Sequence, residues 1–209
     1  MNDNISCVIL AGGKNARMGR NKALLKVGDK TIIEIINEVV GKIFTDVIVV
    51  SNEPDQYAFL NRKVVKDVYP GRGPISGIHS GLNESSTERI FFISCDLPLV
   101  AGEMIEYIIN YPTNKNIVIP TAGNYLQTLC AVYDKSCLPY IEKRLKVDVE
   151  DANGRKQKRF SLIDLMQEIG AEIADVSTLS FYDDKMFFNL NNMNDYEKIK
   201  EIIGSENGS

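Results

Sequence analysis

The sequence predicts a single α/β domain in three layers, with helices on both faces of a mainly parallel sheet. Short apolar runs that fit buried strands recur along the chain, as at 5–10, 46–51 and 89–94. Between them lie segments whose apolar residues recur at helical spacing, which is typical of right-handed β-α-β crossovers. The length of 209 residues suits one such domain. We therefore expect a Rossmann-like fold without an internal domain boundary.

The composition limits the class of protein. A formal net charge of −4 argues against nucleic acid as the main partner, so any phosphate must be bound by a local group of cations. No apolar run approaches the roughly 18 residues of a membrane span, and the polar start MNDNIS shows no signal peptide. The chain contains no CxxC pair, which favours buried thiols in a reduced cytoplasmic protein over a zinc site. The four cysteines are Cys7, Cys95, Cys130 and Cys137.

The first predicted strand leads into the segment LAGGKNARMGRNK at residues 10–22. Gly12 and Gly13 lack a Cβ atom, so the backbone there can bend sharply and approach a ligand closely. Arg17 and Lys22 follow with two further cations, and cations with backbone N–H groups are the usual ligands of a phosphate. The segment matches neither GxxxxGK[ST] nor GxGxxG. Taken alone, its Ala-Gly-Gly start also fits a surface turn before a basic loop.

The next elements predict two strand ends with polar side chains. Thr31 can cap a helix whose apolar face extends to Ile43, and the strand 46–51, a short helix around 55–60 and a strand at 63–66 follow. Asn52 and Asp67 stand where two of these strands end, and open parallel sheets bind ligands at that edge. The Asn52 amide suits a base edge or a ribose, and Asp67 can accept hydrogen bonds from a nucleoside. Turn or cap roles are the ordinary alternatives.

The following helix and strand lead to a candidate metal ligand. Pro74, after two glycines, fits the first turn of a helix that ends near Asn83. This helix carries His79, the chain's single histidine, which we expect to be a surface or packed residue without a catalytic role. The buried strand at 89–94 then delivers Asp96 to the same sheet edge. Mg²⁺ takes carboxylate and phosphate oxygens and keeps several waters, so Asp96 is a candidate ligand, although Asp-x-Pro also occurs in plain turns.

The second half continues the alternation of helices and strands. We expect a helix at 104–109, strands at 116–120 and 129–133, helices at 136–145 and 162–169, and a strand at 173–176. The segment 146–159 carries eight charged residues in fourteen, which predicts a solvated loop; its basic residues are an alternative clamp for an anionic acceptor. In the segment FFNLN at 187–191, alternation places Asn189 and Asn191 on one side. Asn194 and Glu197 predict a final helix cap, and residues 205–209 a disordered tail.

Several motifs together resemble one family. The string LAGGxxxRMGxxK at 10–22 resembles the signature loop of nucleotidyltransferases that attach a nucleoside monophosphate to a phosphorylated acceptor. Within them it is most similar to the molybdenum cofactor guanylyltransferase (MobA) family, and the segments GPISGI, SCDLP and FFNLN resemble later motifs of that family. The resemblance covers most of the chain, more thinly between 138 and 186. The chain departs from the family at Gln127-Thr128, where a Gln-Pro or His-Pro pair is usual.

The resemblance implies an activity and a set of site residues. The implied reaction transfers GMP from GTP to molybdenum-bearing molybdopterin, which forms the guanine dinucleotide cofactor and releases pyrophosphate. The implied catalytic residues are Arg17, Lys22 and Asp96, with Asp96 as the ligand of a Mg²⁺ cofactor. The resemblance assigns the acceptor to Asn189 and Asn191. It assigns the nucleotide to Leu10, Ala11, Gly12, Gly13, Lys22, Asn52, Asp67 and Asp96.

The same resemblance leaves other functions open. The nearest alternatives are a molybdopterin cytidylyltransferase or a sugar-phosphate nucleotidyltransferase, and a different class is a nucleotide-binding regulator without catalysis. Retention of Arg17, Lys22 and Asp96 together disfavours the regulator. We expect one nucleotidyltransferase domain at 1–204, with a nucleotide-binding half at about 1–112 and an acceptor-binding half at about 113–204. The resemblance also leaves open other proteins of molybdenum cofactor assembly as further partners.

Overall fold

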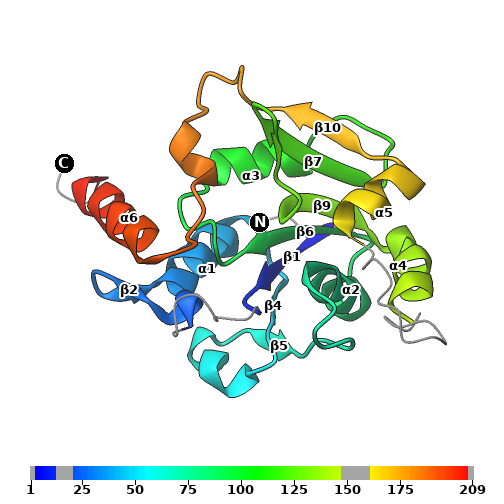
Figure 1. The fold of residues 1–209 in the computed structure, drawn as a ribbon, viewed down its shortest axis with the longest axis horizontal. Helices are drawn as coiled ribbons and strands as arrows, with labels where there is room; N and C mark the ends of the chain where they lie inside the picture. The colour runs from blue at the N-terminus through cyan, green and yellow to red at the C-terminus, as the bar shows by residue number, and fades with distance from the viewer. Residues whose placement is uncertain (1–2, 13–20, 147–160, 207–209) are drawn as a thin grey trace, which may run out of the picture.

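The computed structural model describes residues 3–12, 21–146 and 161–206, and they form the three-layer α/β fold that the sequence predicts (Figure 1). The main sheet has eight strands in the order β10-β7-β9-β6-β1-β4-β5, with β8 paired to β7. Its strands are β1 (Ile5–Leu10), β4 (Val47–Val50), β5 (Lys63–Val65), β6 (Arg89–Ser94), β7 (Ile117–Ala122), β8 (Tyr125–Leu126), β9 (Cys130–Asp134) and β10 (Glu172–Asp175).

Helices cover both faces of this sheet. The α-helices are α1 (Ile32–Ile43), α2 (Pro74–Glu84), α3 (Gly102–Ile109), α4 (Leu138–Leu145), α5 (Leu162–Ile169) and α6 (Met193–Glu206). The short 3-10 helices are η2 (Lys22–Leu24), η3 (Pro54–Leu60), η4 (Lys135–Cys137) and η5 (Asp184–Phe187). A two-stranded hairpin, β2 (Lys26–Val27) and β3 (Lys30–Thr31), lies outside the main sheet, and its strands are too short to be recognised from an apolar pattern.

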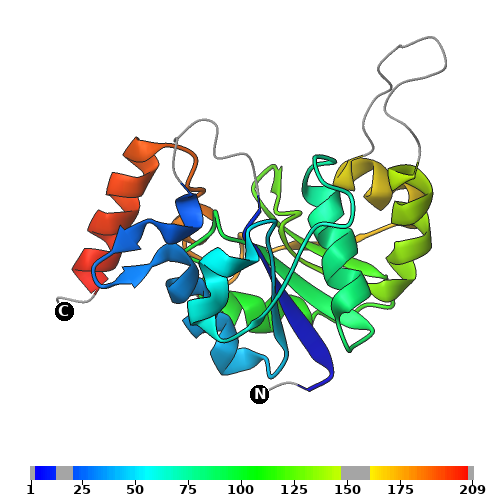
Figure 2. The same ribbon diagram turned by 90° about the horizontal axis from the view of Figure 1, so that it is seen from below.

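The sheet is mainly parallel, and this gives it one edge where most strands end. β1 pairs in parallel with β4 and β6, β4 with β5, and β10 with β7. β9 runs antiparallel between β6 and β7. The last residues of β1, β4, β5, β6, β7 and β10 therefore share one edge, which we call the carboxyl edge. It is the upper edge in Figure 2.

Two apolar cores explain why the strand sequences are continuously apolar. Cys7 and Ile9 of β1 face the core shared with α1, α3 and α6. Val8 and Leu10 of the same strand face the core shared with α2, α4 and α5. A strand that is buried on both faces has no polar alternation, as expected for a parallel sheet. All four cysteines are free and buried, as the sequence predicts.

The helix starts show one confirmed prediction and one wrong one. Thr31 caps α1 in a capping box with Glu34, as its position predicts. The predicted cap of α6 at Asn194 and Glu197 is wrong. Asn192 accepts from the N–H groups of Asn194 and Asp195 at 2.9 and 3.1 Å, and the Asp195 carboxylate accepts from the N–H groups of Asn191 and Asn192. Several asparagines in a row all have cap chemistry, so the sequence alone left the choice open.

Two further expectations concern α6 and His79. Helix α6 extends to Glu206, so it includes the first two residues of the tail expected to be disordered, and residues 207–209 lie outside the described part. His79 is a packed histidine: its side chain is buried on α2, beside Tyr69 and Glu142. No helix in the described part of the chain has both the length and the apolar character needed to cross a membrane.

Candidate active site

Lys22 and Asp96 meet at the carboxyl edge. Asp96 follows β6 by two residues, and Lys22 is the first residue of η2. The Lys22 ammonium lies 3.6 Å from Oδ1 of Asp96, with the lysine side chain 18% and the aspartate side chain 31% exposed. The Asp96 turn is held by its own N–H, which donates to the Ser94 hydroxyl, and by the Cys95 N–H, which donates to the Leu10 carbonyl. The fold therefore joins two distant motifs in one half-buried ion pair.

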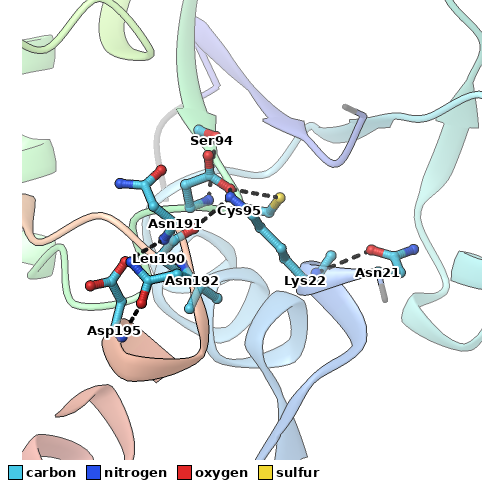
Figure 3. Close-up of polar contacts among 10 residues, drawn as sticks. Asn21, Lys22, Ser94, Cys95, Leu190, Asn191, Asn192 and Asp195 are labelled. Atoms are coloured by element: carbon cyan, nitrogen blue, oxygen red, sulfur yellow. Dashed lines mark hydrogen bonds and ion pairs between the residues drawn. The ribbon is translucent and has the colours of Figure 1, made fainter. Parts of the chain in front are cut away.

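A third segment completes this group from near the C-terminal end. Lys22 Nζ donates to the carbonyl of Leu190 at 2.6 Å, across 168 residues of sequence. The Leu190 N–H in turn donates to the Asp96 carbonyl at 2.9 Å. Figure 3 shows Lys22 extended toward the segment that contains Leu190, Asn191 and Asn192. The buried Leu190 side chain anchors this segment, so its neighbours are presented at the same edge.

Asn189 and Asn191 lie on the side of this segment that faces solvent. Both are exposed, whereas Leu190 between them is fully buried, which confirms the predicted alternation. The Asn189 amide donates to the Phe187 carbonyl at 3.1 Å, and the Asn191 N–H donates to Asp195 at 2.8 Å. The two residues flank Leu190 in the chain, and the backbone of Leu190 bonds both Lys22 and Asp96.

Tyr57, which the sequence analysis did not single out, ties the two ends of the signature segment together. Its hydroxyl donates to the Ala11 carbonyl at 3.1 Å and accepts from the Asn21 amide at 2.9 Å. The Asn21 amide also reaches Gln56, at 2.8 Å. Tyr57 is fully buried, and burial raises the pKa of its hydroxyl above 10.0, so this hydroxyl stays protonated as a donor. A tyrosine in a short helix carries no motif that could have revealed this role.

Asn52 and Asp67 form a second polar pair at the ends of β4 and β5. The Asn52 amide donates to Oδ2 of Asp67 at 3.3 Å, and the Asp67 N–H donates to Oδ1 of Asn52 at 3.1 Å. Burial raises the pKa of Asp67 above 3.8, against the opposing effect of the Asn52 hydrogen bond. β4 and β5 lie two and three strand spacings from β6, so the pair lies roughly 10 to 14 Å from Asp96 along the edge.

The electrostatics of Asp96 reflect burial and one cation. Burial raises the pKa of its carboxyl above 3.8, and the Lys22 ammonium opposes that rise. The Cys95 thiol donates weakly to the same carboxylate, at 3.8 Å, and burial holds that thiol protonated by raising its pKa. A half-buried carboxylate beside a single lysine keeps capacity for a further cation.

The structure thus brings some predicted site residues together, and others lie outside the described part of the chain. Leu10, Ala11, Lys22, Asp96, Asn189 and Asn191 converge on one region of the carboxyl edge, and Asn52 and Asp67 lie farther along it. Gly12 is exposed at the end of the segment that leaves β1. Gly13 and Arg17 lie outside the described residues. The roles of these residues stay predictions.

The side chains at this edge fit one kind of metal ion. Within the described ranges, no group of three or more histidine, cysteine or acidic side chains could hold an ion. Oδ1 of Asp96 contacts Lys22 and Cys95, whereas no described residue bonds Oδ2. A single hard oxygen ligand fits Mg²⁺ that takes its remaining ligands from phosphates and water. It does not fit a structural zinc site.

The fold and this edge define the class of protein: a nucleotide-binding α/β protein whose cationic and acidic side chains meet where the strands end. Comparison with known proteins agrees. The model of the MobA-like NTP transferase domain matches residues 7–160. The chain therefore belongs to the MobA-like NTP transferase family, and it is a nucleotidyltransferase.

Individual relatives extend the similarity over nearly the whole chain. A protein of Clostridium perfringens named probable molybdenum cofactor guanylyltransferase is 36% identical over 201 residues, covering 94% of this chain and 98% of its own. A protein of the same name from Carboxydothermus hydrogenoformans is 33% identical, covering 96% and 97%. The crystal structure of molybdopterin-guanine dinucleotide biosynthesis protein A from Archaeoglobus fulgidus has a TM-score of 0.76, covers 96% and 99%, and is 22% identical, so it supports the fold alone.

Proposed function

We propose that this protein transfers GMP from GTP to molybdenum-bearing molybdopterin and releases pyrophosphate. The observation that carries the proposal is the group formed by Lys22, Asp96 and the Leu190 carbonyl, because three distant segments meet there at the carboxyl edge. The choice of base and acceptor rests on the names of the relatives, which are molybdenum cofactor guanylyltransferases.

The proposed chemistry needs alignment and charge neutralisation more than a strong base. The terminal phosphate of the acceptor is already anionic near neutral pH, and one of its oxygens attacks the α-phosphorus of GTP. The bond from the α-phosphorus to the bridging oxygen breaks, and pyrophosphate leaves with that electron pair. Phosphoryl transfers of this kind depend on positioning and electrostatic stabilisation.

Lys22 is suited to stabilise the triphosphate and the departing pyrophosphate. Its ammonium is held by the Leu190 carbonyl and Asp96, so the charge is already in position before substrate binds. An anionic phosphate competes well for a lysine whose resting partners are a neutral carbonyl and a carboxylate 3.6 Å away. We assign Arg17, with the backbone of Gly12 and Gly13, to the same triphosphate by resemblance to the family.

Asp96 would hold Mg²⁺ together with phosphate oxygens. Its Oδ2 has no bond to any described residue, and a carboxylate at this edge is the hard oxygen ligand that the ion prefers. When bound, the ion supplies charge neutralisation at the phosphates. Asp96 also orients Lys22, so one carboxylate serves both cations.

The remaining residues divide the edge between the two substrates. We assign Asn52 and Asp67 to the nucleoside, since they lie roughly 10 to 14 Å from Asp96 on the β4–β5 side, a distance that a nucleoside triphosphate can span. We assign Asn189 and Asn191 to the acceptor, since their segment is bonded to Asp96 through Leu190. The transferred phosphorus would then lie between these two groups.

A nucleotide panel tests the proposal. GTP, CTP, ATP and UTP are each incubated with the protein and Mg²⁺, with and without molybdenum-loaded molybdopterin, and pyrophosphate is measured. We expect release with GTP that depends on the acceptor. A preference for CTP would assign the chain to cytidylyl transfer, and nucleotide binding without any pyrophosphate would assign it to the non-catalytic regulators.

A further inference from the structure

We propose that the ring of Tyr125, on the β7–β8 hairpin, is a stacking platform for the planar pterin ring of the acceptor. The inference rests on the proposed function and adds a substrate contact to it. Nothing in the motifs of the sequence points to Tyr125, because the residue stands in a two-residue strand beside the unusual Gln127-Thr128 pair.

The hairpin stands at the same edge as the catalytic group. The Ser94 N–H donates to the Leu129 carbonyl at 2.8 Å, so the segment that returns from the hairpin lies directly beside the turn carrying Asp96. Tyr125 precedes Leu129 by four residues, and an extended chain spans roughly 13 Å over that length. In Figure 2 this light-green hairpin rises at the upper edge, close to where β1 ends.

The backbone beneath Tyr125 is well ordered by hydrogen bonds. Ala122 pairs with Tyr125 across a two-residue turn in which Gly123 has a φ of +61°, a conformation that favours glycine. The Thr121 hydroxyl donates to the Gly123 carbonyl at 3.1 Å, and the Gln127 N–H donates to the Pro120 carbonyl at 2.9 Å. A ring on such a short, tied hairpin loses little freedom when it stacks on a ligand.

The ring itself is left in solvent. Tyr125 is 76% exposed, more than any other large apolar side chain in the described part of the chain. Its hydroxyl bonds no described residue, and its ring makes no aromatic contact there. The neighbouring Leu126 is 38% exposed, so both side chains of β8 are accessible. A flat aromatic surface with no internal partner suits a flat heterocycle.

The position along the sheet favours the acceptor ring over the guanine base. Asp96 follows β6, and the two sides of β6 differ. On one side come β9 and then β7 with the hairpin; on the other come β1 and then β4 and β5, whose ends carry the Asn52–Asp67 pair. The chain that leads from β10 toward Asn189 and Asn191 also starts beside the hairpin, because the Val176 N–H donates to the Thr121 carbonyl at 3.1 Å. The hairpin and the proposed acceptor segment therefore belong to the same half of the edge.

Binding of a pterin tests the inference without requiring turnover. The probe is an oxidised, fluorescent 6-substituted pterin with a terminal phosphate, titrated with the full chain and followed by fluorescence anisotropy. We expect Tyr125→Ala to raise its dissociation constant roughly 5- to 20-fold, the usual range for losing one aromatic stack, and Tyr125→Phe to keep it within about twofold. Tyr140→Ala, a matched change at a half-exposed tyrosine on α4, should have no effect.

Binding of GTP is the second measurement in this experiment. Its dissociation constant, measured by calorimetry, should be the same in Tyr125→Ala and wild type, and in turnover the KM for molybdopterin should rise while kcat changes little. Unchanged pterin affinity in Tyr125→Ala overturns the inference and leaves the proposed function standing. A weaker GTP affinity with unchanged pterin affinity would place the ring on guanine and also overturn it. If wild type binds no pterin, both the inference and the proposed acceptor fail.

Discussion

Replacement of Asp96 by Asn separates a metal-binding carboxylate from a simple turn residue. The change keeps the size and shape of the side chain and removes its charge. The backbone bonds of Asp96, from its N–H to Ser94 and from the Leu190 N–H to its carbonyl, do not involve the carboxylate and should persist. Asn also caps turns nearly as well as Asp. A loss of activity in Asp96→Asn would therefore be due to the loss of the negative charge.

The distance from Asp96 to Lys22 shows how strongly the charge of this carboxylate acts on a neighbouring cation. Unit charges 3.6 Å apart, the separation of Lys22 Nζ and Asp96 Oδ1, interact by about 4 to 5 kcal/mol at an effective dielectric constant of about 20. Loss of one preorganised electrostatic group usually slows catalysis about 10²- to 10³-fold, or about 2.7 to 4 kcal/mol. We expect Mg²⁺-dependent pyrophosphate release to fall by that factor, with only partial recovery at high Mg²⁺. GTP should still bind, because Lys22 and the proposed base contacts remain.

Asp96→Asn should lower activity without lowering the stability of the fold. Burial raises the native pKa of Asp96 above 3.8, so the folded protein disfavours its charged form. Between 3.8 and that raised pKa the native state binds more protons than the unfolded state, and the contribution of Asp96 to stability falls as pH rises through this window. At neutral pH, Asp96→Asn should therefore have a Tm equal to or above that of wild type.

The assay combines calorimetry with GTP, pyrophosphate release over a range of Mg²⁺, and thermal unfolding. Asp134→Asn is the matched control, because Asp134 also ends a strand and caps the following turn through Ser136, but β9 is antiparallel and ends at the opposite edge. The control should have wild-type activity. Wild-type turnover and Mg²⁺ dependence in Asp96→Asn would refute the metal-ligand assignment.

Three further predictions concern the lysine, a tight glycine and a helix cap. Lys22→Ala should reduce turnover by roughly 10²-fold or more with an unchanged circular dichroism spectrum, and a near-normal rate would remove this lysine from the mechanism. Gly81→Ala should destabilise the protein by about 1 to 3 kcal/mol in denaturant unfolding, because its Cβ would lie 2.5 Å from Phe92; Gly204→Ala, with open space around it, should not. Thr31→Ala should lower stability by about 0.5 to 2 kcal/mol. Hydrogen bonds from Thr31 lower the pKa of Glu34 below 4.5, so this contribution is present above that value and disappears as pH falls through the lowered pKa; an equal loss at all pH values would contradict the capping box.

The sequence by itself determined the elements and the chemistry of the edge. Continuous apolar runs predicted β1, β4 and β6, because a strand buried on both faces has no need of polar alternation. Thr31 before an apolar face at helical spacing predicted the start of α1, because capping depends on residues close together in the sequence; the partner Glu34 in the capping box came from the structure. The end of each strand can also be read from the local sequence, so Asn52, Asp67 and Asp96 could be predicted at the carboxyl edge from the sequence alone.

The tertiary structure alone decided which of these residues meet. The order of the strands depends on contacts between segments far apart in the chain, and it leaves Asn52 and Asp67 paired while joining Asp96 to Lys22. Two contributions to the site have no signal in the sequence. The Leu190 carbonyl is a backbone acceptor for the Lys22 ammonium, and the Tyr57 hydroxyl is a donor on a buried tyrosine in a short helix. The exposure of the Tyr125 side chain was likewise decided by the tertiary structure, since the local sequence does not show whether a distant segment packs against a strand residue. Local signals arise from propensity and periodicity, whereas a site is made by long-range packing.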